Sequence, residues 1–306
     1  MAWDQDRGIT GASMSTRGSA TRANDAGRSA AKNPNSGNAN EKSETLMTLL
    51  ARVTSRARLA RQCRSARVIL LVATALIVLA APVTAQERLG HELGEFEFLP
   101  TSTGVLITAP HGTYDANTAP LAVEVARRLG AGYVVARRFT VDQTRINVNR
   151  PTEGAGLACA REPHTARAKE VYGLYAQVVS TTSVGRPLRL YVEIHGNSDS
   201  RTSQRIEIAT TGISRDQARS VKDAYPAILV RAREQVPVYP ELALLVEPLD
   251  QVVFNASCAK SVGIFATDLV PRVVHFEFPR SVRERESREA TALLIAEIVR
   301  VLMAER

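Results

Sequence analysis

The sequence contains few cysteines, and none of them lies close to another. Only three cysteines occur among the 306 residues and Cys-x-x-Cys is absent, so a cysteine-based zinc site is excluded. Gly-x-Ser-x-Gly is absent as well, which disfavours a serine hydrolase. No internal repeat is present, so the chain lacks the signature of a solenoid or a propeller.

Acidic residues are fewer than basic ones, but the imbalance lies almost entirely near the N-terminus. The formal net charge is +8. Residues 1–85 hold 12 of the 39 Lys and Arg and 5 of the 31 Asp and Glu, which leaves a net charge of +1 for the remainder. A nucleic-acid-binding protein carries its basic surface on the folded domain. We therefore expect no nucleic-acid partner.

Long hydrophobic runs are also scarce, and the most prominent one, 68–81, follows an arginine-rich segment. Residues 1–45 have almost no large apolar side chains, so we expect them to be disordered. After the apolar run comes Pro82-Val-Thr-Ala85, which ends in small residues. The order basic, apolar, small is that of a secretory signal peptide cleaved after Ala85.

Two alternatives at the N-terminus stay open. The run 68–81 is shorter than the ~20 apolar residues of a membrane span, but an uncleaved signal-anchor would hold the protein to the inner membrane. Met47 is an alternative start, which would make residues 1–46 an extension that is not translated. We expect residues 47–85 to direct export to the periplasm or outside the cell, and residues 86–306 to form one folded domain.

Strand and helix patterns alternate along residues 86–306. This alternation predicts an α/β fold, a three-layer sandwich whose mostly parallel or mixed central sheet is covered by helices on both faces. Pro226 is expected to break or kink the third helix. Strands are predicted at 105–109, 133–136, 188–194, 205–209, 242–246 and 273–278, and helices at 118–129, 166–180, 214–236 and 287–304.

Two histidines end predicted strands, and a glutamate lies within a third. His111 follows strand 105–109, His195 follows strand 188–194, and Glu277 lies inside the last strand. In α/β sheets, chemistry collects where strands end, because the loops converge there. Zinc binds imidazole nitrogen and carboxylate oxygen and leaves one position for water. His111 and His195 are therefore predicted zinc ligands, although either one alone could be a hydrogen-bonded structural histidine.

The third ligand is predicted to be a carboxylate near one of these histidines. Asp115 follows His111 in a loop that must turn sharply at Gly112, which could return the carboxylate to the imidazole. Glu193 is the alternative ligand, but it lies one strand repeat before His195, and we expect it to orient an imidazole instead. Asp115 could also serve only to cap the following helix.

Glu277 has a different predicted role. Beside the metal, its carboxylate can take a proton from the attacking water and pass it to the leaving amine. His275 lies on the same strand face as Glu277 and could line the pocket, but we expect a packed strand histidine. Cys159 and Cys258 remain in the exported part, where a disulfide can form, but two free thiols are equally compatible with the sequence.

Four short motifs follow one another along the sequence: Ala109-Pro-His111-Gly, Arg145-Ile-Asn147-Val-Asn149-Arg150-Pro, Val192-Glu-Ile-His195-Gly-Asn and Phe276-Glu277-Phe. In this order they resemble the N-formylglutamate amidohydrolase family, a branch of the zinc carboxypeptidase-like hydrolases. The resemblance implies their α/β fold, a zinc cofactor and hydrolysis of an amide bond. It also implies that Arg150, with Asn149 beside it, binds a substrate carboxylate, for which a planar guanidinium is suited. Arg145 is a second candidate for that role or for polarising a carbonyl, and Arg150 could equally form a surface ion pair.

Three positions differ from the family's pattern. Asn147 and Glu193 stand where the family has aspartate, and Gly196 stands where it has serine. These differences and the expected export favour another N-acyl amino acid, or a small peptide, over formylglutamate. We therefore expect an exported zinc-dependent amidohydrolase. The alternatives are a metal-free periplasmic module that binds carboxylate ligands, and a structural protein tethered to the membrane by residues 68–81.

Overall fold

The structure, a computed structural model, describes residues 85–183 and 186–304. The predicted extension 1–46 and nearly all of the predicted signal peptide or anchor 47–85 lie outside these ranges, so both stay predictions. Within the two described ranges, the structure contains no helix that combines the length and the apolar character needed to cross a membrane.

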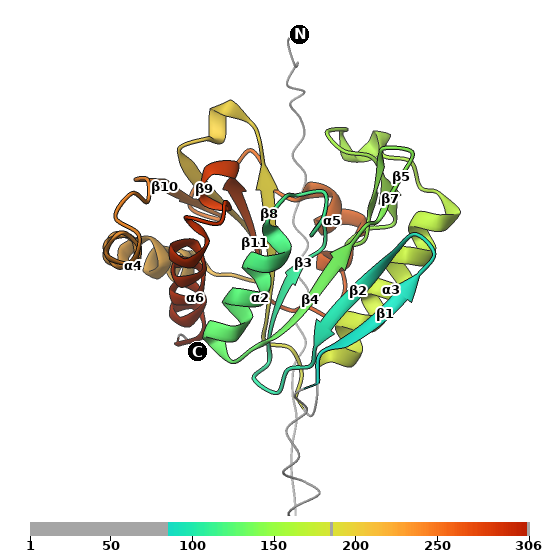
Figure 1. Cartoon of the computed structure of the whole chain (residues 1–306), viewed down its shortest axis with the longest axis horizontal. Helices are drawn as coiled ribbons and strands as arrows, with labels where there is room; N and C mark the ends of the chain where they lie inside the picture. Colours follow the sequence, from blue (N-terminus) through green and yellow to red (C-terminus); the bar gives the residue numbers. More distant parts are fainter. Residues whose placement is uncertain (1–84, 184–185, 305–306) are drawn as a thin grey trace, which may run out of the picture. The chain divides into compact units, whose positions relative to one another are not determined.

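An eight-stranded sheet runs through the centre of the fold (Figure 1). The strands are adjacent in the order β1-β2-β4-β3-β8-β11-β9-β10. Neighbours are parallel in the pairs β4–β3, β3–β8, β8–β11 and β9–β10 and antiparallel in the rest, so the predicted mixed, mostly parallel sheet is confirmed. The strands are β1 Glu87–His91, β2 Gly94–Leu99, β3 Val105–Ala109, β4 Gly132–Arg137, β8 Leu190–Asn197, β9 Arg205–Thr211, β10 Ala243–Val246 and β11 Val273–Pro279.

Helices cover both faces of this sheet, as predicted (Figure 1). One hydrophobic cluster joins the sheet to α2 (Thr118–Leu129), α4 (Arg215–Gln235) and α6 (Arg288–Ala304). A second cluster joins the opposite face to α3 (Ala166–Thr182) and α5 (Ser257–Val262). The central strands are therefore buried from both sides, as expected for parallel strands in a three-layer fold.

Short elements were not predicted from the sequence. A three-stranded sheet forms from β5 (Thr140–Val141), β6 (Thr144–Asn147) and β7 (Thr152–Glu153). The 3₁₀ turns are η1 Cys159–Arg161, η2 Ser200–Thr202, η3 Ile264–Ala266 and η4 Arg280–Val282. The small sheet carries the second motif: Arg145 and Asn147 lie in β6, and Asn149 and Arg150 lie between β6 and β7.

The predicted break at Pro226 does not occur, because α4 continues through this residue. Proline removes only one intrahelical hydrogen bond. On both sides of it the helix packs into the core through Val221, Tyr225, Ile228 and Ala232, which are buried at helical spacing. This packing holds the two halves together, so tertiary contacts outweigh the local preference of the proline.

The two faces of the central strands differ in polarity. Leu190, Val192 and Ile194 of β8 pack against α2, α4 and α6, whereas Tyr191 packs on the other side. Because side chains alternate along a strand, Glu193 and His195 share the face of Tyr191. By the same alternation, the polar face also carries Thr108 of β3 and His275 and Glu277 of β11. The site is built on this face.

Candidate metal centre

The strand register brings the site residues together. β3, β8 and β11 are parallel neighbours, so their carboxyl ends share one edge of the sheet. In the β8–β11 pairing, His195 is opposite Glu277 and Glu193 is opposite His275. The sequence predicted a strand that ends just before His195. In the structure β8 extends to Asn197, so His195 lies inside the strand. The pairing with β11 explains the longer strand, because it supplies backbone partners as far as Asn197.

His111, Asp115 and His195 converge at this edge. The Oδ2 atom of Asp115 lies 3.3 Å from Nδ1 of His111 and 3.2 Å from Nδ1 of His195. All three donor atoms lie within 4.8 Å of one another, and the three side chains are buried. A tetrahedral zinc ion with bonds of about 2.0–2.2 Å separates its ligand atoms by roughly 3.3–3.6 Å. The group could therefore hold a metal ion of this kind.

The loop after β3 returns Asp115 to His111 by one tight turn. The Asp115 amide donates to the His111 carbonyl at 2.7 Å. At Gly112, a Cβ atom would meet the Ala136 carbonyl at 2.8 Å, so glycine lets this turn pack against β4. The Asp115 carboxylate does not cap α2, whose N-cap residue, Asn117, makes no side-chain capping hydrogen bond. Only the Asp115 carbonyl meets Thr118, which leaves the carboxylate for the histidines.

His111 has the properties of a metal ligand. Both ring nitrogens are buried and lack a hydrogen-bond partner among the described residues, and the 3.3 Å approach to Asp115 does not have hydrogen-bond geometry. A buried polar atom in this state is costly and calls for an explanation. Burial and the charge of Arg145 lower the pKa of His111 to about 3, which keeps the ring in the neutral form that binds metals.

Glu193 orients two imidazoles instead of facing an open position. Its Oε2 atom lies 2.8 Å from Nε2 of His195 and 3.1 Å from Nδ1 of His275. The same carboxylate accepts hydrogen bonds from Asn149 at 2.9 Å and from the Tyr191 hydroxyl at 2.9 Å. Glu193, His195 and His275 form a second group with metal-ligand spacing, but each carries a hydrogen-bond partner already. This pattern fits a carboxylate behind a metal ligand.

Two carboxylates act on His195 from opposite sides of its ring. Burial opposes protonation of His195, but hydrogen bonds to Asp115 and Glu193 outweigh it and raise its pKa to about 9. The Nδ1 atom faces Asp115 and the Nε2 atom faces Glu193. A metal ion bound at Nδ1 would therefore leave the Glu193 contact intact, so the ring is held in one orientation with or without the ion.

Glu277 lies beside the centre and not in it. Its Oε1 atom is 3.3 Å from Nε2 of His275, and its Oε2 atom accepts from Asn197 at 3.4 Å. His275 therefore lines the site between Glu193 and Glu277, and its ring stacks on that of His195 at a centroid distance of 4.2 Å. The expectation of a packed histidine missed this bridging position.

The predicted arginines occupy different positions. Arg145 faces the centre: its Nη1 atom lies 3.8 Å from Oδ1 of Asp115, and its guanidinium lies 5.0 Å from the ring centroid of the half-exposed Tyr114. Arg145, Tyr114 and His111 line one pocket. Arg150 instead forms a two-pronged ion pair with Glu162, with both contacts at 2.8 Å. Of the two predicted arginines, Arg145 is therefore the one that lines this pocket.

Asn149 and Arg150 act on the centre indirectly. Arg150 donates through Nη1 to Oδ1 of Asn149 at 3.2 Å, and Asn149 in turn donates to Glu193. Glu162, which the sequence analysis did not identify, anchors this chain of contacts by accepting from Arg150 and Thr152. The arrangement connects the second motif to His195 through Glu193.

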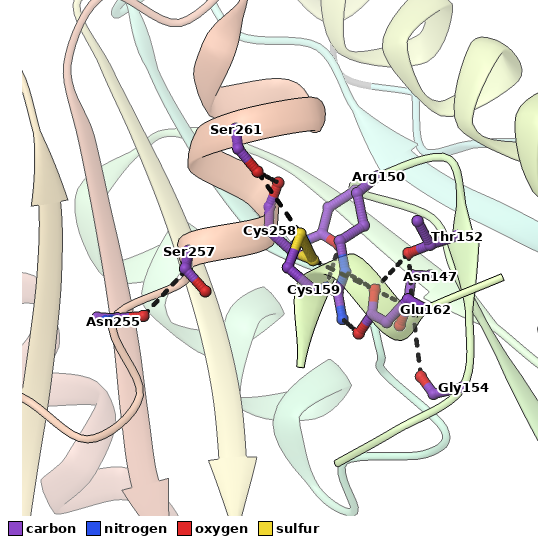
Figure 2. Close-up of a disulfide and its surroundings, with 11 residues drawn as sticks. Asn147, Arg150, Thr152, Gly154, Cys159, Glu162, Asn255, Ser257, Cys258 and Ser261 are labelled. Carbon is purple, nitrogen blue, oxygen red and sulfur yellow. Dashed lines mark hydrogen bonds and ion pairs between the residues drawn. A yellow bond between two sulfur atoms is a disulfide. The ribbon is translucent and has the colours of Figure 1, made fainter. Parts of the chain in front are cut away.

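A disulfide joins Cys159 to Cys258 and borders this network (Figure 2). Cys159 in η1 and Cys258 in α5 are 5.1 Å apart at their Cα atoms and 99 residues apart in the sequence. The structure therefore resolves the choice between a disulfide and free thiols in favour of the disulfide. The Arg150–Glu162 pair lies directly beside it (Figure 2).

Comparisons with known proteins give similarity in structure only. No protein-family model matches the chain, and a search of curated proteins finds no significant match. A metallo-carboxypeptidase from Burkholderia cenocepacia has 13% sequence identity and a TM-score of 0.40, covering 75% of this chain and 67% of that one. A bacteriophage poly-gamma-glutamate hydrolase has 12% identity and a TM-score of 0.36, covering 74% and 95%.

Bovine thrombin-activatable fibrinolysis inhibitor, in complex with tick carboxypeptidase inhibitor, has 9% identity and a TM-score of 0.40, covering 78% of this chain and 97% of that one. Because these TM-scores lie below 0.5, the similarities assign neither a family nor an activity to this chain. What its residues can do follows from the buried centre itself.

Proposed function

We propose that this chain is a zinc-dependent amidohydrolase that cleaves an N-acyl amino acid or a small peptide. The observation that supports this most directly is His111, which lies beside Asp115 and His195. Within residues 85–183 and 186–304, its two buried ring nitrogens have no hydrogen-bond partner. The order of the four sequence motifs, which resembles that of N-formylglutamate amidohydrolases, supports the same reaction class. The proposal extends to export, for which the segment before Ala85 has the composition of a signal peptide.

His111, His195 and Asp115 would hold the ion. Bound zinc would supply a Lewis acid that activates water and polarises the scissile carbonyl. We prefer Asp115 to Glu193 as the third ligand because the Glu193 carboxylate already meets His195, His275, Asn149 and Tyr191. Glu193 would instead hold the His195 ring in the orientation that turns Nδ1 toward Asp115.

Glu277 would be the general base and then the general acid. Its carboxylate lies on the neighbouring strand, opposite His195, and it is held there by His275 and Asn197. It would take a proton from the attacking water and deliver it to the leaving amine nitrogen. No other carboxylate on the polar face of β11 is available for this proton transfer.

Arg145 would bind the carboxylate of the substrate or polarise its carbonyl. Its side chain is mostly buried, it lines the pocket next to His111, and its Nη1 atom is 3.8 Å from Asp115, which is longer than a hydrogen bond. Arg150 was the first candidate for carboxylate binding, but its Nε and Nη2 atoms already donate to Glu162. We therefore transfer that role to Arg145 and give Arg150 and Asn149 the support of Glu193.

Metal analysis and activity together test the proposal. The purified protein should carry close to one equivalent of zinc, and a chelator should abolish hydrolysis of N-acyl amino acids, with recovery on adding zinc. His111→Ala and His195→Ala should lose both the metal and the activity. Less than about half an equivalent of metal, with no gain on adding more, would contradict the proposal and favour the metal-free binding module.

A further inference from the structure

A buried arginine lies at the back of the candidate centre. Arg283 follows η4 and is only 4% exposed. Its guanidinium donates to three backbone carbonyls: Nη1 to Ala116, Nη2 to Asn197 at 3.3 Å and Nε to Phe278 at 3.3 Å. A planar guanidinium can donate in several fixed directions at once, which a lysine ammonium on a flexible stem does less specifically.

Each of these carbonyls belongs to a segment that carries a residue of the centre. Ala116 directly follows Asp115, and Phe278 directly follows Glu277. Asn197 lies two residues after His195. One side chain therefore connects the loop after β3, the end of β8 and the end of β11. In sequence, these three segments are separated by about 80 residues each.

Gly196 makes room for this guanidinium. A Cβ atom at position 196 would overlap Cζ, Nη1 and Nε of Arg283. The guanidinium is the far end of a flexible side chain and could move aside, but it would then give up the three carbonyls. The N-formylglutamate amidohydrolases, which this chain resembles, have serine at this position. The glycine found here thus leaves the space that the Arg283 guanidinium needs.

The charges around Arg283 are consistent with this position. Burial lowers its pKa, and the nearby carboxylates of Asp115, Glu277 and Glu284 oppose the shift. A buried cation needs such compensation, since an unpaired one would be expensive. The Gly196 amide also lies 3.4 Å from Oδ2 of Asp115, so the backbone that Arg283 contacts is in touch with the proposed ligand.

We infer that Arg283 is a positioning residue that holds the three segments of the centre in register, and that Gly196 is required to admit it. The inference rests on the proposed function for its effect on catalysis. The connection between the three segments can be measured without any activity. Among the described residues, the hydrogen bonds of the Arg283 guanidinium go to backbone carbonyls, and Arg283 does not line the pocket next to His111. It would therefore act through Asp115, His195 and Glu277 and not on the substrate.

The test compares Arg283→Ala, Arg283→Lys and Gly196→Ala in the full chain, with Glu284→Gln as the matched control. Glu284 also joins the η4 segment to the loop after β3, since its carboxylate accepts from Asn117 at 3.0 Å, but it reaches neither Asn197 nor Phe278. The first readout is hydrogen exchange of metal-free protein at residues 112–117, 196–199 and 277–279. Arg283→Ala and Gly196→Ala should speed exchange in all three segments together, and Glu284→Gln in the first at most.

The second readout is zinc affinity, kcat and KM. Arg283→Ala and Gly196→Ala should each lower zinc affinity or kcat by about 10- to 100-fold with little change in KM, the range for residues that orient ligands. Arg283→Lys should fall between wild type and Arg283→Ala. Adding Gly196→Ala to Arg283→Ala should cause less than about a twofold further loss, because the side chain that it displaces is already gone.

Two results would overturn the inference. The first is hydrogen exchange in segments 196–199 and 277–279 that Gly196→Ala leaves unchanged. The second is a double variant, Gly196→Ala with Arg283→Ala, whose loss of zinc affinity or kcat equals the product of the two single losses. If Arg283→Ala does not fold, Gly196→Ala and Arg283→Lys decide the matter by the same measurements. A wild-type protein that neither binds zinc nor hydrolyses amides would refute the proposed function. The hydrogen-exchange measurement would still test whether Arg283 connects the three segments.

Discussion

Glu277 and His195 lie directly opposite each other in the parallel pairing of β11 with β8. Both residues are buried, and both side chains lie on the polar face of the sheet. His195 belongs to the group around Asp115, whereas Glu277 is held just outside it by His275 and Asn197. A carboxylate next to a metal-ligand group, but not part of it, is suited to moving a proton.

Replacing Glu277 by glutamine should therefore remove catalysis and spare the metal. We expect Glu277→Gln to lower kcat by about 10²- to 10⁴-fold, the usual contribution of a general acid or base, while zinc content stays close to one equivalent. An assay of amide hydrolysis gives kcat, and metal analysis of the same sample gives the zinc content. Glu207→Gln is the matched control, because Glu207 faces Glu277 across the β9–β11 pairing but accepts from the Val253 and Phe254 amides. Full activity in Glu277→Gln would refute its role.

Asp115 and Glu193 can be separated by their effects on zinc affinity. If Asp115 is the third ligand, Asp115→Asn should weaken zinc binding by more than Glu193→Gln does. For Glu193→Gln we expect zinc affinity to fall by about 10- to 100-fold, as for a carboxylate that orients a ligand histidine. Competition with a chromophoric chelator measures both constants. The opposite order would identify Glu193 as the ligand and Asp115 as the support.

The Arg150–Glu162 pair should contribute to stability at neutral pH and not in acid. Burial would raise the pKa of Glu162, but hydrogen bonds and charge from Arg150, with help from Thr152, outweigh it and hold the pKa below the ordinary 4.5. A carboxyl whose pKa is lowered by folding stabilises the protein above its unfolded-state pKa, and this contribution disappears as the pH falls through the folded-state value.

Glu162→Gln should thus destabilise the fold by about 3 kcal/mol near pH 7, because it leaves a buried arginine without its counter-ion. The difference from wild type should shrink steadily as the pH is lowered from about 5 toward 3. Urea unfolding curves at a series of pH values provide the measurement. A difference that is constant over this range would mean that the Glu162 charge does not stabilise the folded state.

Removing the disulfide should lower stability substantially. The bridge closes a loop of about 100 residues, for which the loss of chain entropy in the unfolded state predicts about 4–5 kcal/mol and measured values span about 2–5 kcal/mol. For a domain of this size, Cys159→Ser with Cys258→Ser should lower Tm by roughly 5–15 °C. Reductant should produce a similar decrease in wild type and none in the double variant. An equal effect of reductant on both would point to another cause.

The sequence predicted the sheet and the two histidines because those features depend on local pattern. Strand 105–109 and helix 118–129 match β3 and α2, since apolar alternation and the Pro-early, Gly-late signals act within a dozen residues. The convergence of His111 with His195 followed from one topological rule, that parallel strands end at a common edge. Neither step needed information about distant parts of the chain.

The remainder of the site depends on pairings that no local pattern encodes. The sequence left Arg150 either to bind a substrate or to form an ion pair. Its partner Glu162 comes from a loop without a motif, and only the fold places the two side chains together. Arg283 stands in a charged stretch of sequence, which is typical of a solvated segment. In the structure it is only 4% exposed, and its guanidinium fills the space that Gly196 leaves. The β1–β2 hairpin was missed because Gly90 and Gly94 weaken its strand pattern.

The register between β8 and β11 makes the length of these two strands a constraint on the protein's evolution. Adding or deleting a single residue of β8 before Glu193 would turn Glu193 and His195 toward the apolar layer under α2, and Ile194 toward the polar face. Changes of length should therefore be tolerated in the turn at 198–204, beyond the end of β8. Within Leu190–Asn197 and Val273–Pro279, a shift of one position would exchange the polar face of the sheet, which carries the site, for the apolar one.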